Sequence, residues 1–486
     1  MKKITLANYL ISMILLISLV SIGNAQQENS NWYFGNQAGL NFNDGTSPPT
    51  TLTNSSMTSQ RSAASVSDSS GNLLFYTDGI NVWNNVHQIM PNATGLFGNN
   101  EIAQSVLIVP DPNNASKYYI FTNRGNVMGL SGIYYSIIDM SLDGGLGDID
   151  VTQKNIILQG VGTYNKNLTV ILNSNDNSYW VVIFGSGDGI VSDTFYTYKV
   201  DALGVNLANQ ATFTFNLNEN PDNATGQMKI SPDGQSLALI HNTVGAGRNG
   251  EFEEAQSLFV FDFDGATGAI SQLNDSFSLN DNLYSYGLEF SPDSNLLYVS
   301  TTNRLSDGRP IGRIHQIQHR GMGQPSILIY EDPDPIYSLQ LGIDGKIYSV
   351  NYSSQFVGTI NNPNIIDTGA NYVYDNITLS SSSLTYDLPQ LVPFIFLNEI
   401  TKKAKKPIIM GNPFKEELKF KFKFIQTYTI EFYNSNGALS KGVVYDDMTN
   451  RKPFPVDTSD LETGTYYLIV RDGQSQVWYE TVLKIE

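Results

Sequence analysis

The chain is built on short stretches in which apolar and polar residues alternate, each followed by a tight turn. In residues 286–300, YGLEFSPDSNLLYVS, Leu288 and Phe290 alternate with polar neighbours, so both side chains can lie on one face of a strand. Residues 291–294 are typical of a turn, because Pro presets φ and the Asp and Ser side chains bond back to nearby backbone. Residues 296–299 resume a β-rich run. The pattern predicts a two-stranded hairpin.

The same hairpin pattern recurs along the chain. The aspartates that mark its turn are Asp68, Asp111, Asp176, Asp233, Asp293 and Asp344. They lie about 40–65 residues apart, and propeller blades repeat about every 40–50 residues, so each copy is interpreted as a blade with loop insertions. The first strands of the copies are residues 64–67, 105–109, 168–172, 228–230, 288–290 and 339–341. The alternative is a set of β-sandwiches, but a sandwich has no reason to repeat one turn unit six times.

Several copies carry a third strand, which we interpret as the outer strand of its blade. These strands are residues 133–138, 194–200, 257–263 and 311–318. Two further segments, residues 31–42 and 388–396, predict strands without completing a copy. Joined into one sheet they would form a seventh blade and remove the open edge of the ring. We therefore predict that Trp32, Tyr33, Leu40 and Phe42 share a sheet with residues 388–396, and that residues 26–398 form a seven-bladed β-propeller in an all-β chain.

The first residues predict a signal peptide, residues 1–25. Lys2 and Lys3 precede an apolar run over residues 9–22, and small residues at its end favour cleavage after Ala25. An uncleaved membrane anchor is the alternative, but the run is short for a span and a polar stretch follows it. No later stretch is apolar and long enough to span a bilayer. We expect the mature chain to be exported without a transmembrane span.

A change in composition after Asn398 predicts a second domain. A basic linker over residues 399–407 precedes five predicted strands within residues 408–486, which indicates a small β-sandwich. Within it stand Asn412-Pro413-Phe414, a strand and turn that end at Gly437, and the run that contains Leu461, Gly464 and Tyr466. These motifs resemble the type A sorting domain of the type IX secretion system. The resemblance implies that the type IX machinery delivers the chain to the outer surface or the medium.

Two departures from the sorting-domain pattern are visible. The family usually has Pro where Gly411 stands, and it often ends more basically than residues 484–486. They leave the site of sorting-domain cleavage open. Residues 31–122, with NWYFGNQAGLNF and QSVLIVPDP, resemble large secreted propeller proteins of Bacteroidota-type bacteria. That resemblance implies a surface propeller whose ligand is usually unassigned, and it transfers no catalytic residue.

Composition excludes several kinds of chemistry. The net charge of −18 disfavours nucleic acid as a partner. The absence of cysteine excludes disulfides, thiolate metal sites and a cysteine nucleophile. His315 and His319 would lie on one face of a strand but ~13 Å apart, so we expect two exposed polar side chains rather than a metal pair. The acidic loops at residues 143–150 and 332–334 suit turns better than calcium, and no particular cofactor is indicated.

Aromatic residues near predicted strand ends are the best functional lead. They are Tyr134, Tyr135, Trp180, Tyr196, Tyr284, Tyr286 and Tyr337. Such faces pack sugar rings and peptide side chains, although aromatic residues also fill propeller cores. The first hypothesis is a surface-displayed, non-catalytic binding or adhesion propeller for a glycan or protein ligand. The alternative is a secreted glycan lyase or lactonase-type hydrolase with its site at the central channel. Because the first strands supply few ionisable residues, the sequence favours binding.

Overall fold

The computed structural model describes most of residues 27–485. The described residues are 27–392 and 408–485 without the segments 44–45, 126–130, 162–164, 187–191, 216–225, 247–251, 279–284, 305–308, 320–325, 352–354, 381–384, 422–426, 435–438, 447–452 and 473–476. The chain divides into two compact units, residues 1–395 and 396–486. Ala25, Tyr284, Gly437 and the linker 399–407 lie outside the described residues. No helix in the described part of the chain is long and apolar enough to cross a membrane.

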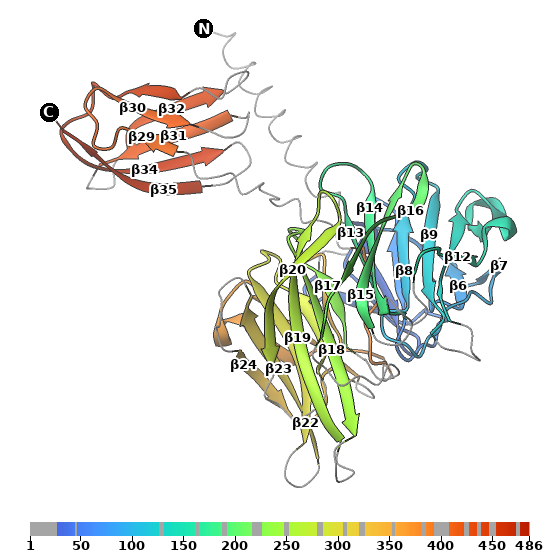
Figure 1. Cartoon of the computed structure of the whole chain (residues 1–486). Helices are drawn as coiled ribbons and strands as arrows, with labels where there is room; N and C mark the ends of the chain where they lie inside the picture. The colour runs from blue at the N-terminus through green and yellow to red at the C-terminus, as the bar shows by residue number, and fades with distance from the viewer. Residues whose placement is uncertain are drawn as a thin grey trace. The chain divides into compact units, whose positions relative to one another are not determined.

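The described residues of the first unit form seven antiparallel sheets that follow one another along the chain (Figure 1). The first three contain β1 (Asn31–Phe34), β2 (Ala38–Asn41) and β3 (Thr50–Leu52); β4 (Ala64–Ser67), β5 (Leu73–Thr77), β6 (Asn81–Asn84) and β7 (Ile89–Thr94); and β8 (Val106–Pro110), β9 (Lys117–Asn123), β10 (Ile133–Asp139), β11 (Asp148–Ile149) and β12 (Ile156–Ile157). The next two contain β13 (Asn165–Leu172), β14 (Tyr179–Ser186), β15 (Ser192–Asp201) and β16 (Gly204–Thr212); and β17 (Met228–Ile230), β18 (Ser236–Ala246), β19 (Phe252–Asp264) and β20 (Ala269–Ser278).

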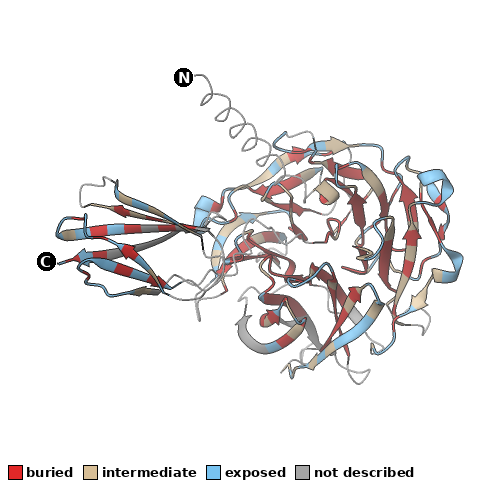
Figure 2. Ribbon diagram, turned by 90° about the horizontal axis from the view of Figure 1, so that it is seen from above, coloured by how far each residue is buried: buried red, intermediate tan, exposed pale blue. Residues whose placement is uncertain are grey.

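The last two sheets complete the ring. They contain β21 (Ser285–Phe290), β22 (Leu296–Arg304), β23 (Pro310–Gln318) and β24 (Ile327–Asp332); and β25 (Leu339–Leu341), β26 (Ile347–Val350), β27 (Phe356–Ile360) and β28 (Tyr372–Thr378). Short 3₁₀ helices are η1 (Gln27–Asn29), η2 (Asp143–Gly145), η3 (Val151–Gln153) and η4 (Asp367–Ala370). Figure 2 shows the sheets side by side around a common centre, as in a β-propeller. The first strands β4, β8, β13, β17, β21 and β25 neighbour one another and surround that centre.

The turns after β17 and β21 are stabilised by their own Ser and Asp side chains. In the copy after β17, the Ser231 hydroxyl donates to Asp233 at 2.7 Å and accepts from the amide of Ser236 at 3.0 Å. Gly234 has φ of +64°, which glycine adopts without cost, and its amide donates to the carbonyl of Ser231 at 2.8 Å. The copy after β21 repeats this geometry around Ser291. One sequence unit therefore reproduces one hairpin.

The core lies between neighbouring sheets. One cluster joins Ala238, Ile240, Leu258 and Val260 of one sheet with Leu288, Phe290, Leu297, Val299 and Ile317 of the next. Strands buried on both sides read as continuous apolar runs, as do residues 237–240. Such a cluster buries the facing sides of two neighbouring sheets.

The sheets have more strands than the sequence predicted. Residues 133–138, 194–200, 257–263 and 311–318 lie in β10, β15, β19 and β23, but these are third strands rather than the outermost. A fourth strand such as β16 pairs outside them. It was missed because GVNLANQAT is half-exposed or exposed throughout, and its alternation of large apolar residues is limited to Val205 and Leu207.

Ring closure also differs from the prediction. Trp32, Tyr33, Leu40 and Phe42 pack in one apolar cluster with Leu388 and Leu391, but the described residues 388–392 form no ladder with β1–β3. Their one bridge is parallel and joins Gln390 to Ala64, whose sheet is β4–β7. Pro389 has no amide hydrogen, which interrupts a regular ladder at this point. Packing rather than a shared sheet therefore joins the two ends here, and residues 393–396 lie outside the described residues.

The second unit has two sheets among its described residues. One orders β29 (Ile408–Met410), β30 (Glu417–Lys421) and β33 (Phe454–Asp457); the other orders β32 (Leu439–Asp446), β31 (Thr427–Tyr433), β34 (Gly464–Asp472) and β35 (Val477–Lys484). Inward residues of both sheets, among them Phe414, Leu418, Ile430 and Leu468, form one core. The unit is therefore a small β-sandwich.

Candidate functional site: the polar centre of the propeller

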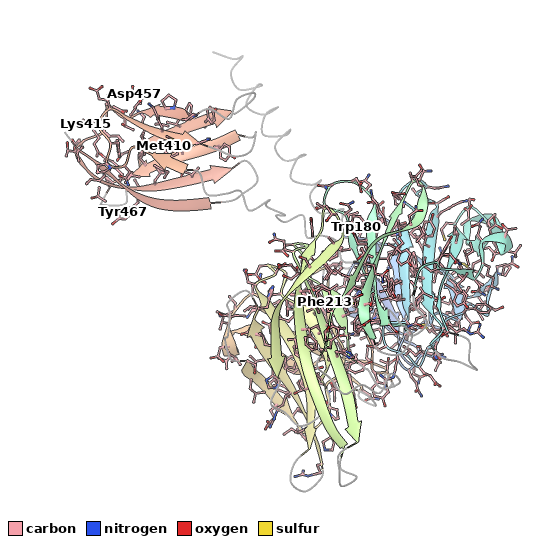
Figure 3. The ribbon with its side chains drawn as sticks, viewed as in Figure 1. Trp180, Phe213, Met410, Lys415, Asp457 and Tyr467 are labelled. Atoms are coloured by element: carbon pink, nitrogen blue, oxygen red, sulfur yellow. The ribbon has the colours of Figure 1, made fainter. Side chains whose placement is uncertain are left out.

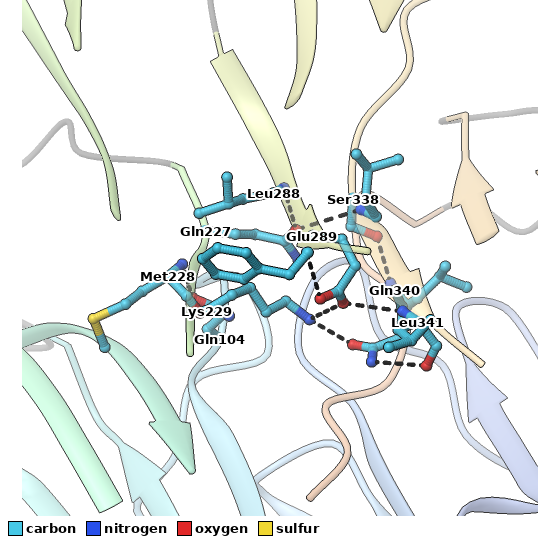
Figure 4. A network of polar contacts seen from close by, with 12 residues as sticks. Gln104, Gln227, Met228, Lys229, Leu288, Glu289, Ser338, Gln340 and Leu341 are labelled. Atoms are coloured by element: carbon cyan, nitrogen blue, oxygen red, sulfur yellow. Dashed lines mark hydrogen bonds and ion pairs between the residues drawn. The ribbon is translucent and has the colours of Figure 1, made fainter. Parts of the chain in front are cut away.

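Three first strands place a polar residue at the same point of the repeat. Lys229 of β17, Glu289 of β21 and Gln340 of β25 each stand two residues before the first residue of the turn. Figure 4 shows them converging at the centre. The Lys229 ammonium lies 3.0 Å from a Glu289 carboxylate oxygen and donates to the Gln340 side-chain carbonyl at 2.7 Å. Because both charges are buried, each needs the partner it has.

Glu289 is also satisfied by backbone donors. It accepts from the amide of Leu341 at 2.9 Å, across to β25, and from the amide of Phe290 at 3.0 Å. The exposed fractions of the Lys229 and Glu289 side chains are 11% and 6%. The pair thus ties two neighbouring first strands together and presents little charge to solvent.

Two glutamines that stand just before first strands, Gln104 and Gln227, bind the backbone of strands in other sheets (Figure 4). The Gln104 side chain accepts from the amide of Met228 at 2.7 Å and donates to its carbonyl at 2.9 Å. The Gln227 side chain accepts from the backbone amide of Leu288 at 3.0 Å. The backbone amide of Gln227 donates to the carbonyl of Tyr286 at 2.9 Å. Glutamine side chains thus add to the backbone hydrogen bond in joining these segments of different sheets.

A second group, the Arg61 cluster, consists of Arg61, Tyr286, Tyr337, Tyr386 and Asp387. It lies where the first strands begin. Arg61 donates from Nη1 to the Tyr286 hydroxyl at 3.1 Å, and that hydroxyl donates to Asp387 at 2.7 Å. The guanidinium carbon lies 4.5 Å from the ring centre of Tyr386 and 5.6 Å from that of Tyr286. Tyr337 meets both tyrosine rings edge to face, at 4.7 Å and 5.6 Å.

Close backbone approach explains why two of these tyrosines meet. A Cβ at Gly287 would collide with the carbonyl of Tyr337, so only glycine lets β21 run this near to residue 337. The Gly287 amide donates to Ser300 Oγ at 2.8 Å, and Ser300 in turn donates to the Tyr337 carbonyl at 2.5 Å. The contact is therefore fixed by backbone and not by the tyrosines alone.

Burial dominates the electrostatics of the Arg61 cluster. It raises the pKa of Asp387 to about 7, although the Tyr286 hydrogen bond, Arg61, Lys229 and Gln227 oppose the rise. Burial, aided by the nearby Asp387, also raises the pKa of Tyr286 well above its usual value. Burial opposes the charge of Arg61, but Tyr286 and Asp387 outweigh it and raise the pKa of that guanidinium. The cluster thus holds one fixed positive charge and one carboxyl group that titrates near neutrality.

The aromatic residues singled out in the sequence lie in three different places. Trp180 and Tyr196 are buried and donate to the carbonyls of Gly265 at 3.0 Å and Ser186 at 2.9 Å, so both belong to the core (Figure 3 labels Trp180). Tyr134 and Tyr135 are half-buried in β10. Among the described members of this set, Tyr286 and Tyr337 are the two that lie in the Arg61 cluster.

The prediction that His315 and His319 are exposed is wrong. Their exposed fractions are 9% and 5%. His315 lies in β23, a third strand, and pairs with Leu328 of β24, whereas His319 directly follows β23. His319 packs against Phe290 with ring centres 5.1 Å apart. Among the described residues, no group of three or more His, Asp or Glu lies close enough to hold a metal ion.

The acidic loops form turns. Asp148 is buried and accepts from the amide and side chain of Asn92 at 2.8 Å and 2.6 Å. Asp150 caps η3 through the amide of Thr152 at 2.9 Å, while Asp143 opens η2. Asp332 accepts from the amide of Asp334 at 2.9 Å. The carboxylates of Asp150 and Asp332 thus accept from local backbone amides, and that of Asp148 accepts from Asn92.

The sorting-motif residues converge on the last strand. The Asn412 side chain accepts from the amide of Leu483 at 2.9 Å, and the amide of Phe414 donates to the Leu483 carbonyl at 2.9 Å. Pro413 stands between them, and Leu461 and Tyr466 are buried in the same core as Phe414. Gly464, at the start of β34, has φ of +155°. Figure 3 shows this unit with Met410, Lys415, Asp457 and Tyr467 labelled.

Lys484 was not predicted as a functional residue. Its ammonium donates to the carbonyls of Lys415 and Thr458, both at 2.6 Å, and its exposed fraction is 7%. Lys229, Glu289 and Gln340 were missed as well, although aligning the repeats on their turns places all three in one column. Arg61 and Asp387 gave no signal, because they lie outside the repeat.

Comparison with known proteins identifies the second unit. Residues 408–484 match the family described as the secretion system C-terminal sorting domain. This stretch is the type IX sorting domain, so the chain is exported to the outer surface or the extracellular space. No curated protein matches the chain.

Solved structures resemble the chain only distantly. A glucose dehydrogenase is 12% identical over 60% of this chain and 94% of its own, with a TM-score of 0.34. A protein from Lactobacillus plantarum is 12% identical over 81% and 98%, with a TM-score of 0.36. An exo-β-1,3-galactanase from Phanerochaete chrysosporium is 9% identical over 83% and 97%, with a TM-score of 0.35. Similarities this low carry no argument about function.

Proposed function

We propose that this protein is a non-catalytic binding or adhesion propeller, which its C-terminal sorting domain delivers to the cell surface or the medium. Its ligand is a surface glycan or a protein. The propeller provides the binding surface, and the sorting domain engages the type IX machinery. The fold alone does not distinguish a binder from an enzyme, so the proposal rests on the centre of the ring.

The observation that carries the proposal is the closed pairing of the central charges. Lys229 and Glu289 are buried, lie 3.0 Å apart, and are further occupied by Gln340 and by backbone amides. A general acid or base must reach the proton that it transfers, whereas these groups face one another. Their arrangement supports a structural role.

The centre is also occupied by chain from both ends of the propeller. Asn29 donates from its side chain to the carbonyl of Val392 at 2.8 Å. Val392 packs in the cluster that contains Leu107 and Leu168, from the first strands β8 and β13. Because these segments fill space that a channel site would need, they support binding at the faces of the ring.

One observation favours the alternative, a secreted glycan lyase or lactonase-type hydrolase. Asp387 has a pKa of about 7 and is held by Tyr286, as suits a general base or acid near neutral pH. Such shifts also arise in structural networks. An enzyme would require Asp387 to contact substrate.

The discriminating experiment follows the fate of bound ligand. Residues 26–486 are screened on a glycan array and against surface proteins, and each bound ligand is incubated overnight and analysed by mass spectrometry. We expect retained binding and unchanged ligand. Product that appears with the wild type and disappears with Asp387→Asn would reject the binding role in favour of the enzyme.

Export is tested separately by deleting residues 405–486. The propeller should then accumulate, folded, in the periplasm, because the unit that engages the machinery is gone. Lys419→Gln, at a side chain 46% exposed, is the control and should be exported normally. Export of the deleted chain at the normal level would show that the second unit is dispensable.

A further inference from the structure

Arg61 has hydrogen-bonding capacity that the described protein does not use. A guanidinium carries five N–H donors, and among the described residues only the Tyr286 hydroxyl accepts from it. No described carboxylate lies within ion-pair distance, since Asp387 is reached only through that hydroxyl. The positive charge therefore remains available to an acceptor from outside.

The surroundings of Arg61 are aromatic and reach solvent. Arg61, Tyr337 and Tyr386 are half-buried, while Tyr286 and Asp387 beneath them are buried. Stacking on Tyr386 at 4.5 Å and the bond to Tyr286 fix the plane of the guanidinium. A guanidinium held in this way is pre-organised, so little freedom is lost when a ligand binds.

This arrangement has a matching ligand chemistry. A planar guanidinium binds a carboxylate through two parallel hydrogen bonds, and tyrosine rings pack against sugar rings. We propose that the Arg61 cluster binds the carboxylate of a uronic acid in a glycan, with Tyr337 and Tyr386 contacting the sugar ring. This inference rests on the proposed binding function and gives that function a site and a ligand class.

The charge of the whole protein limits the length of the ligand. A net charge of −18 repels a long polyanion, whereas a short oligouronate brings few charges to one fixed cation. Asp387 serves as a positioning residue, because it holds the Tyr286 hydroxyl that orients Arg61. We therefore expect recognition of one uronate residue at a time.

The test uses three ligands that differ in one group. Trigalacturonate, its methyl ester and neutral galactotriose are titrated into residues 26–486 by calorimetry. We expect trigalacturonate to bind at least tenfold more tightly than the other two, because only it offers a carboxylate. Arg61→Gln should reduce that affinity at least tenfold, and Arg61→Lys, which keeps the charge but loses the planar fork, should cause an intermediate loss.

A matched control is available in Arg124. It is also half-buried, and its guanidinium carbon lies 4.5 Å from the ring centre of Phe97, the same stacking distance as Arg61 over Tyr386. Arg124→Gln should leave trigalacturonate binding unchanged. The melting temperature of each variant is recorded to show that it folds. If Arg61→Gln fails to fold, the affinity of Arg61→Lys for trigalacturonate provides the test.

Several results would overturn the inference. Equal affinity for the methyl ester would remove the carboxylate from recognition, and no binding of trigalacturonate would remove the site. Tighter, Arg61-dependent binding of triglutamate would replace the glycan by an acidic peptide. Binding of another glycan or protein independently of Arg61 would reject this site while leaving the binding role intact. Arg61-dependent binding accompanied by cleavage would support the site and reject the non-catalytic role.

Discussion

The indole ring of Trp32 packs edge to face on the ring of Tyr348, with ring centres 5.5 Å apart, and so joins β1 to β26 of the last sheet. Trp32 is fully buried. We expect Trp32→Ala to lower the free energy of unfolding by about 3–5 kcal/mol, because it opens a cavity between the first and last sheets of the propeller. Deleting residues 26–43 should destabilise the whole propeller. Urea unfolding followed by circular dichroism measures both.

Leu203→Ala provides the control for this prediction. Leu203 lies in the same unit with an exposed fraction of 88%, so its truncation should change stability by no more than about 0.5 kcal/mol. A chain without residues 26–43 that keeps the melting temperature of the full chain would show that packing at the closure contributes nothing.

Lys484 should stabilise the sorting domain. Lys484→Met keeps an apolar stem but leaves the carbonyls of Lys415 and Thr458 without their donor, which costs about 2–4 kcal/mol. Hydrogen exchange measured by mass spectrometry should therefore show that residues 408–485 lose protection, whereas the protection of residues 27–392 stays unchanged. In Lys419→Met, which removes an exposed ion pair with Glu417, protection should stay as in the wild type. The same protection in both variants would refute the role of Lys484.

Asp387 should make the stability of the propeller depend on pH. Its pKa is about 7 in the fold and near 3.8 in an unfolded chain, so the folded state binds the proton more tightly. The stability from this proton is present below pH 4 and is lost as pH rises through 7. Asp387→Asn stays neutral, so the wild type should lose on the order of 2–4 kcal/mol relative to it between pH 4 and pH 8. Urea unfolding at both pH values measures this, and identical pH slopes would contradict it.

Limited proteolysis tests the boundary between the two units. The linker 399–407 is rich in lysine, and we predict that trypsin cuts there first and leaves a stable fragment that ends near residue 400. Peptide mass mapping over time locates the first cut. Initial cuts within residues 27–392 would place the weakest point inside the propeller instead.

The sequence was most informative where one residue pattern determines one local structure. β4, β17 and β25 begin and end where the alternation places them, because the Ser-Pro-Asp-Gly type of turn fixes where each first strand stops. The sorting domain was visible through its short motifs, although Asn412 and Phe414 make their contacts with Leu483, far away in the sequence.

The centre of the ring could not be predicted in the same way. Arg61, Tyr286 and Asp387 meet only because the ring closes, and no local pattern records that they are neighbours. Fourth strands such as β16 were missed because a half-exposed or exposed outer strand has only a short apolar alternation. The predicted pairing of residues 388–392 with the first sheet was wrong. Pro389 prevents a regular ladder there, and these residues join the first sheet by packing instead.

The contact between Asn29 and Val392 sets an order of events for a newly made chain. The side chain of Asn29 can bind the carbonyl of Val392 only after all seven sheets of the propeller have been synthesised. Until then the first and last sheets of the propeller are not packed against one another. Contacts between residues this far apart in sequence form slowly. The ring therefore locks last, after the final strand of the propeller has emerged, and a chain still threading through a membrane stays open throughout its passage.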